Sequence, residues 1–216
     1  MELLRVVAFT SSPRVDGNSR LLAEAVLEGA RGAGHTTEIV HLPSMIDGLL
    51  RDCRTCRGAD GLCTIDDGMG EAFARYLAAD VVVYSTPLWW YGMSSWMKVF
   101  IDRFFCFSTA SAPGHDEIGE RLVAKKAVLV MSAEERYPAA VAGVVHQVQE
   151  LSRYLHHELV GVVVGVGNSR GEVVSDPADP LARARELGAR LADARGTDYR
   201  VETDRPNRVW GDPVDA

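Results

Sequence analysis

Apolar residues along the chain alternate between short continuous runs and longer stretches with helical spacing. The continuous runs predict buried strands at residues 3–9, 36–42, 81–84, 127–131 and 159–166. Apolar residues three or four positions apart predict helices at residues 19–31, 66–79, 94–104, 138–155 and 180–194. Because strands and helices alternate along the whole chain, the pattern predicts an α/β fold with parallel strands and helices on both faces.

The expected sheet is doubly wound, with five parallel strands in the order 2-1-3-4-5. In that order the loops after the first and third strands are neighbours at the edge where open α/β folds bind ligands. We expect one domain over residues 1–195 and a polar C-terminal tail over residues 196–216, with Trp210 as a candidate anchor. Residues 43–66 and 108–120, which are rich in turn-forming residues, are expected to be irregular.

The loop after the first strand, residues 10–20, reads TSSPRVDGNSR. Its hydroxyl groups, the Asn18 amide and the backbone N–H groups of a helix N-terminus favour a bound phosphate. The loop has no lysine at the place where a P-loop needs one. Its single glycine, Gly17, is too few for the dinucleotide fingerprint, which needs three. A single terminal phosphate, as in a mononucleotide such as FMN, fits this loop best.

The loop after the third strand reads STPLWWYGMSS and is unusually aromatic. A flavin ring needs apolar walls and backbone N–H donors, and Leu88 and the aromatic run 89–91 offer both. The alternative is that these aromatic residues belong to the core or to a dimer contact. We prefer that alternative for Trp96 and Phe100, which lie inside the helix that follows.

The composition of the chain argues against some classes of binding partner. The formal net charge of −7 and the isoelectric point near 5.4 argue against nucleic acid or an anionic membrane as a partner. The N-terminal sequence MELLRVVAFTSS resembles neither a signal peptide nor a membrane span, so a cytoplasmic location is expected. Four cysteines in a chain of 216 residues are then expected to be reduced thiols or ligands rather than disulfides.

Three segments in order, TSSPRVDGNS, CRTCRGADGLCTIDDGM and STPLWWYGMSSWMKVFIDR, resemble the NAD(P)H-dependent FMN reductases of flavodoxin-like fold. The resemblance covers roughly the first half of the chain, and the remainder has a compatible order of elements. It implies that FMN is bound at three strand ends. The phosphate would lie near Ser11, Ser12, Arg14, Asn18 and Ser19, and the isoalloxazine ring near Pro87, Leu88, Trp89, Trp90, Tyr91, Gly92, Ser132, Ala133 and Glu134.

Cys53, Cys56 and Cys63 could be read as ligands of a cluster. In iron–sulfur relatives of this family the resemblance calls for a further cysteine near Ala59, and an iron–sulfur cluster normally takes four thiolates. Cys106 is distant in the sequence, so we expect no metal. Redox activity of Cys53 and Cys56 as a dithiol remains open, although the expected strand-to-helix setting is missing.

Two polar stretches leave alternatives open. The segment GVGNSRG, residues 165–171, follows a strand, but its spacing is wrong for a dinucleotide loop, so we interpret it as a plain strand exit. Glu134, Glu135 and Arg136 follow the fourth strand and either contact a substrate or form a solvated loop.

These features predict an oxidoreductase that passes electrons from NADPH or NADH through bound FMN to a small acceptor, such as a quinone, free flavin, nitro or azo compound. No catalytic acid, base or nucleophile is needed, because the flavin carries the chemistry. The alternative is a flavodoxin-like electron carrier or an FMN-binding sensor without turnover. The resemblance also suggests a homodimer or homotetramer.

Overall fold

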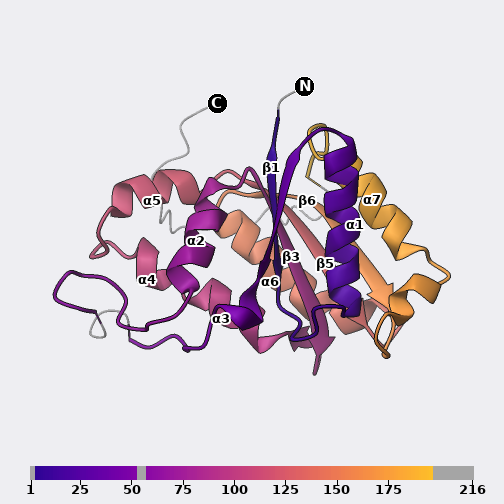
Figure 1. Cartoon of the computed structure of the whole chain (residues 1–216), viewed down its shortest axis with the longest axis horizontal. Helices are drawn as coiled ribbons and strands as arrows, with labels where there is room; N and C mark the ends of the chain where they lie inside the picture. Colours follow the sequence, from indigo (N-terminus) through magenta and orange to yellow (C-terminus); the bar gives the residue numbers. More distant parts are fainter. Residues whose placement is uncertain (1–2, 53–56, 197–216) are drawn as a thin grey trace.

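Five strands run parallel through the middle of the molecule and point their carboxyl ends at one edge (Figure 1). The computed structural model describes residues 3–52 and 57–196, so Cys53, Cys56 and nearly all of the predicted tail, including Trp210, lie outside the described residues. The parallel strands, in the spatial order β2-β1-β3-β5-β6, are β1 (Arg5–Thr10), β2 (Thr36–His41), β3 (Val81–Trp89), β5 (Lys126–Ala133) and β6 (Glu158–Val166). The predicted fold class is confirmed.

A sixth strand, β4, is only two residues long and is not part of the parallel set. β4 (Gly92–Met93) pairs antiparallel with the end of β3, with Trp89 opposite Gly92. The sequence pattern ended the third strand at Tyr84, whereas β3 continues to Trp89 and stays paired with β5 as far as Pro87. The polar residues in this extension hid it, because an apolar run was the signal for a strand.

Helices cover both faces of the sheet. One face carries α1 (Asn18–Gly32) and α7 (Pro180–Ala189), and the opposite face carries α2 (Met69–Ala78), α3 (Ser95–Asp102) and α6 (Ala142–Tyr154). Glycines let α1 and α7 pack unusually closely: a Cβ atom at Gly188 would lie 1.9 Å from the Val26 carbonyl oxygen. The short 3₁₀ turns are η1 (Leu42–Ser44), η2 (Pro138–Val141) and η3 (Glu172–Ser175).

The segment predicted as a loop at residues 108–120 is partly helical. After the short helix α4 (Phe105–Ser108), the chain forms α5 (His115–Leu122). Its first turn contains Asp116 and Glu117, which suit the positive end of the helix dipole, and Leu122 is buried. The loop expectation was wrong here because glycine and proline before the helix outweighed two turns of weak helical pattern.

No helix within residues 3–52 and 57–196 is long and apolar enough to cross a membrane.

Candidate functional site

The loop after β1 is joined to the end of β3 by buried hydroxyl groups. Ser11 Oγ donates to the Ser85 carbonyl oxygen at 2.9 Å, and Ser85 Oγ donates to the Ser19 carbonyl oxygen at 2.8 Å. Ser94, the N-cap of α3, donates from Oγ to the Ser11 carbonyl oxygen at 3.1 Å. Buried hydrogen bonds of this kind hold the two predicted binding loops in one fixed arrangement.

A cavity of about 180 Å³ opens where these loops meet. Most of the predicted binding residues line it, and they come from the ends of β1, β3 and β5: Ser12, Arg14, Asn18, Ser19, Pro87, Leu88, Trp89, Ser132, Ala133 and Glu134. The fold therefore brings residues from three separate predicted segments to one cavity. Ser11 does not line this cavity, because its side chain faces the Ser85 carbonyl oxygen.

Among the described residues, this cavity, the smaller of two, is lined by a buried hydroxyl without a hydrogen-bond partner and by an arginine without an ion pair. Ser19 Oγ is buried and has no hydrogen-bond partner among the described residues, although it lies in the first turn of α1. No side chain within the described residues caps the start of α1 at Gly17, so its N–H groups are open to a ligand. Arg14 is exposed and forms no ion pair in residues 3–52 and 57–196. These groups fit a phosphate, because helix N-termini and arginine bind anions.

Asn18 lines the cavity as expected, but its side-chain amide is engaged by another loop. Its Nδ2 donates to the carbonyl oxygens of Gly167 and Ser169, both at 2.9 Å, and its Oδ1 accepts from the Val173 N–H at 3.3 Å. The amide therefore joins the loop after β6 to the start of α1, and its donors are already engaged. An ion pair between Arg170 and Asp16, at 3.1 Å, connects the same two loops on the surface.

Sequence reasoning missed Gly167 and Asn168, which also line the smaller cavity. We had interpreted residues 165–171 as a plain strand exit. A Cβ atom at Gly167 would lie 2.8 Å from the Val173 nitrogen and 3.0 Å from Asn18 Nδ2, so only glycine fits between the loops. The available signal was position: β6 ends at the same edge of the sheet as the other binding loops.

The aromatic residues after β3 form a strained hairpin. Trp90 and Tyr91 are the two residues between β3 and β4, and both have positive φ, 49° and 60°. A two-residue turn of this kind normally takes asparagine and glycine. Bulky side chains in this conformation cost about 1–2 kcal/mol each, so the strain indicates a constraint other than stability.

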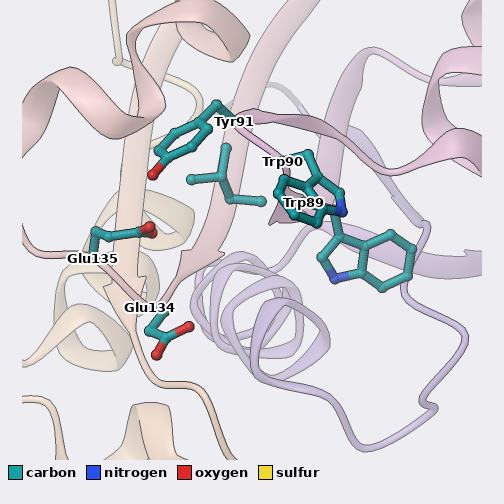
Figure 2. Close-up of a pocket in the computed structure, with 6 residues that line it drawn as sticks. Trp89, Trp90, Tyr91, Glu134 and Glu135 are labelled. Atoms are coloured by element: carbon teal, nitrogen blue, oxygen red, sulfur yellow. The ribbon is translucent and has the colours of Figure 1, made fainter.

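A second cavity, of about 370 Å³, adjoins the first and shares Leu88, Trp89 and Glu134 with it. Trp90, Tyr91 and Glu135 complete its walls. Figure 2 shows Trp89 and Trp90 on one side of this cavity, and Tyr91 with the two glutamates on the other. Trp90 is 97% exposed, so it is not a core residue in this chain. Of the predicted residues, Gly92 lines neither cavity.

The Tyr91 phenol lies beside the Glu135 carboxylate on one side of this cavity and hydrogen-bonds with it (Figure 2). Hydrogen bonding with Tyr137, and the nearby charge of Glu135, raise the pKa of Tyr91 to about 12. The phenol therefore stays protonated at neutral pH and can donate a hydrogen bond. A polar edge next to apolar walls is the usual chemistry of a site for a planar aromatic molecule.

The family model Flavodoxin_2, described as a flavodoxin-like fold, matches residues 4–189. The chain belongs to this flavodoxin-like family. The family predicted from three short segments is thereby confirmed over nearly the whole domain. The match also includes β5 and β6, which the sequence resemblance covered only through the order of elements.

Other flavodoxin-like proteins are similar over most of their length. An iron–sulfur flavoprotein of Archaeoglobus fulgidus is 29% identical over 202 residues, covering 92% of this chain and 84% of that protein. The Bacillus subtilis protein YwqN, provisionally named as an NAD(P)H-dependent FMN-containing oxidoreductase, is 23% identical over 184 residues, with coverage of 85% and 97%. The structure of an NAD(P)H:quinone oxidoreductase from Methanothermobacter marburgensis superposes with a TM-score of 0.61 at 21% identity, with coverage of 88% and 98%. At that identity the structural likeness supports the fold alone.

The cysteines are arranged differently from the sequence expectation. Cys106, which we had judged too distant in sequence, lies with its Sγ 3.8 Å from Cys63 Sγ. Arg103 Nη2 is 3.7 Å from Cys63 Sγ, and the Arg103 guanidinium forms a buried ion pair with Asp67. Burial raises the pKa of the Cys63 thiol, but hydrogen bonds from the Ile65 N–H and from Arg103 lower it more, so the net shift is downward. The expected absence of a metal stays a prediction.

Proposed function

We propose that this chain is an FMN-dependent oxidoreductase that takes electrons from NAD(P)H and passes them to a small organic acceptor. The observation that carries the proposal is the buried Ser19 Oγ at the start of α1, beside an aromatic wall: within the described part of the chain this oxygen has no hydrogen-bond partner and no side chain caps the helix. The names of the Bacillus subtilis relative and of the quinone oxidoreductase support the same activity.

Each group of residues has a separate task in this proposal. Ser12, Ser19 and Arg14, with the first N–H groups of α1, hold the FMN phosphate. Leu88 and Trp89 lie against the ring and exclude water from one side, and Ser132 and Glu134 border it at the end of β5. FMN, when bound, supplies the transfer of a hydride or of single electrons.

The larger cavity favours an enzyme over an electron carrier, because a carrier needs no site for a second substrate. It adjoins the smaller cavity and has a volume of about 370 Å³, which is room for a second planar ring. A reductase must bind the nicotinamide ring first and the acceptor afterwards. We infer that the two substrates bind in this cavity one after the other, so the enzyme should show ping-pong kinetics.

Absorbance spectroscopy tests the proposal directly. Protein purified or reconstituted with FMN should absorb near about 450 nm, as expected for bound flavin, and should bleach when NADH or NADPH is added without oxygen. A protein that binds FMN but does not bleach would be a carrier or a sensor. A protein that cannot be reconstituted with FMN would overturn the proposal.

The oligomeric state is a second part of the proposal. The exposed hairpin at Trp90 and Tyr91 offers apolar surface to another copy of the chain. We expect a homodimer or homotetramer, and sedimentation of a monomer would contradict this expectation.

A further inference from the structure

The two adjoining cavities share Glu134 but differ in their other charged groups. The smaller cavity carries the guanidinium of Arg14 next to the start of α1, where the helix dipole adds partial positive charge. The larger cavity carries the carboxylates of Glu134 and Glu135, and neither lysine nor arginine is among the described residues that line it. A phosphate therefore suits the first cavity, and a cation suits the second.

The nearest basic side chain in the sequence does not neutralise these glutamates. Arg136 follows Glu135 directly, but its Nη1 lies 3.3 Å from Asp176 Oδ1, and Asp176 is buried. The guanidinium is therefore held by a different carboxylate. Glu134 is exposed, and Glu135 is half-buried and hydrogen-bonds with the Tyr91 phenol, which leaves its remaining lone pairs for a molecule in the cavity.

The aromatic wall favours the same sign of charge. The faces of tryptophan and tyrosine rings carry partial negative charge and attract cations within about 6 Å. Trp89 and Trp90 lie on the side of the cavity opposite the two carboxylates, whereas Tyr91 lies beside Glu135 (Figure 2). A planar cation between them would stack on an aromatic face and meet a carboxylate at its edge.

We propose that the larger cavity selects planar aromatic rings that carry or develop positive charge over neutral or anionic rings of the same shape. The inference rests on the proposed function and adds the substrate class. Two sources share this chemistry: the oxidised nicotinamide ring, which is a pyridinium cation, and a cationic aromatic electron acceptor.

The first source gives Glu134 and Glu135 a role in catalysis. When the C4–H bond of the reduced nicotinamide breaks, the hydride carries both electrons to oxidised flavin, and the ring left behind gains one positive charge. Fixed carboxylates near that ring stabilise the charge as it forms, which is the usual way in which preorganised groups lower a barrier. The neutral reduced ring gains less from the same carboxylates.

A charge series on one ring tests the selectivity by binding alone. The probes are 1-methylnicotinamide, which is cationic, nicotinamide, which is neutral, and nicotinate, which is anionic, each titrated by ligand-observed NMR into FMN-loaded protein. We expect the cation to bind about tenfold more tightly than the neutral ring, with the anion weakest. Equal affinity for the three rings would overturn the inference.

Matched variants assign the effect to the two carboxylates. In Glu134→Gln/Glu135→Gln the ratio of cation to neutral affinity should fall about tenfold, towards unity. The control Glu117→Gln/Glu120→Gln changes net charge equally on α5, outside both cavities, and should keep the ratio. If both double variants lower the ratio equally, the selectivity belongs to the whole molecule, and the assignment to this cavity is wrong.

The acceptor arm uses naphthoquinones that carry a trimethylammonium, hydroxymethyl or sulfonate group on the same short chain. We expect kcat/KM to decrease in that order, by about tenfold per step, and Glu135→Gln to compress the series. Turnover of all three at one rate would leave the proposed function intact and overturn the inference. Selective binding of the cation without oxidation of NADH or NADPH would support the charge selectivity and overturn the proposed function.

Discussion

The two ends of the central sheet use their polar groups in opposite ways. At the amino end, Lys125 Nζ donates to the carbonyl oxygens of Leu77 and Ala79, at 3.0 and 2.6 Å, and His157 Nε2 lies 2.8 Å from the Leu122 carbonyl oxygen. At the carboxyl end, Ser19 Oγ has no partner among the described residues, and Trp90 is 97% exposed. At the amino end, side chains bind backbone carbonyl oxygens. At the carboxyl end, some side chains remain available to a ligand.

This difference separates stability from binding. Changes at the amino end should alter the free energy of unfolding and leave ligand affinity alone. Changes to cavity-lining groups at the carboxyl end that have few internal partners should do the opposite, because such groups contribute little to folding.

The largest effect is expected for the affinity of FMN. Ser12→Ala/Ser19→Ala removes two hydroxyl groups that face the smaller cavity. Hydrogen bonds to a charged phosphate contribute about 1.5–3 kcal/mol each, so the dissociation constant should rise roughly a thousandfold. Fluorescence titration of free FMN measures the constant. Unfolding without FMN should change by only about 1 kcal/mol, because Ser12 Oγ accepts a single hydrogen bond, from the Arg14 N–H at 3.2 Å.

Ser11→Ala is the matched control for this pair. Its hydroxyl group faces the Ser85 carbonyl oxygen rather than the cavity. The variant should lose about 1 kcal/mol of stability and keep its affinity for FMN. If it loses as much FMN affinity as the double variant, the cavity does not distinguish neighbouring serines and the comparison fails.

The second effect is an acid dependence of stability from the amino end. Burial lowers the pKa of His157 to about 4 from its usual value of 6.5. The unfolded chain therefore binds a proton between pH 6.5 and pH 4 that the folded chain does not. The stabilisation from burying the neutral ring is complete above pH 6.5, and about 3 kcal/mol of it is lost as the pH falls to 4.

Urea unfolding of wild type and His157→Gln between pH 7 and pH 4 measures this contribution. The difference in unfolding free energy between the two proteins should shrink by about 3 kcal/mol over that range. His146→Gln, an exposed position on α6, should keep the wild-type dependence. A pH-independent difference would show that His157 titrates normally in the folded protein.

Sequence patterns predicted these two ends unequally. The strand order and the gathering of three loops at one edge follow from alternation and from general rules of parallel sheets, so they were accessible. Ser11 and Ser12 are identical in chemistry, and only the fold decides that Ser12 faces the cavity while Ser11 faces Ser85. Asn18 was expected at the phosphate, but its partners lie 149 and 151 residues away in sequence, which no local pattern reveals.

The hairpin was inaccessible for a different reason. Positive φ at two consecutive positions is normally signalled by asparagine and glycine, and here the residues are Trp90 and Tyr91. The sequence therefore indicated an aromatic wall without the turn that builds it. The contacts at the amino end were not predictable either. In the sequence Lys125 and Lys126 have the pattern of surface residues, and only the structure shows that they bind backbone carbonyl oxygens.

A third, smaller effect concerns Lys126. Its Nζ donates to the carbonyl oxygens of Leu191, Ala192 and Ala194, at 2.7, 2.8 and 3.0 Å, and so ties the chain after α7 to the start of β5. Lys126→Met should lose about 2 kcal/mol of unfolding free energy, because these carbonyls lose a charged donor. FMN affinity should stay within twofold of wild type, and a larger change would mean that the two ends are coupled.

The smallest effect on stability is expected at Trp90, where the φ of 49° is unfavourable for any side chain with a Cβ. Trp90→Gly relieves that strain, whereas Trp90→Ala keeps it and removes the same ring. The glycine variant should therefore be more stable than the alanine variant by about 1 kcal/mol in urea unfolding, even though glycine is usually the more costly residue.

Both variants should bind 1-methylnicotinamide about threefold more weakly than wild type, because an exposed cation–π contact contributes about 0.5–1 kcal/mol. The two variants would then differ in stability while they lose the same affinity, so the strain at this position would be separate from the contribution of the ring to binding. If Trp90→Gly instead loses stability and keeps its affinity, the ring packs on this chain or on another copy of it. The strained hairpin would then belong with the parts of the molecule that serve assembly rather than binding.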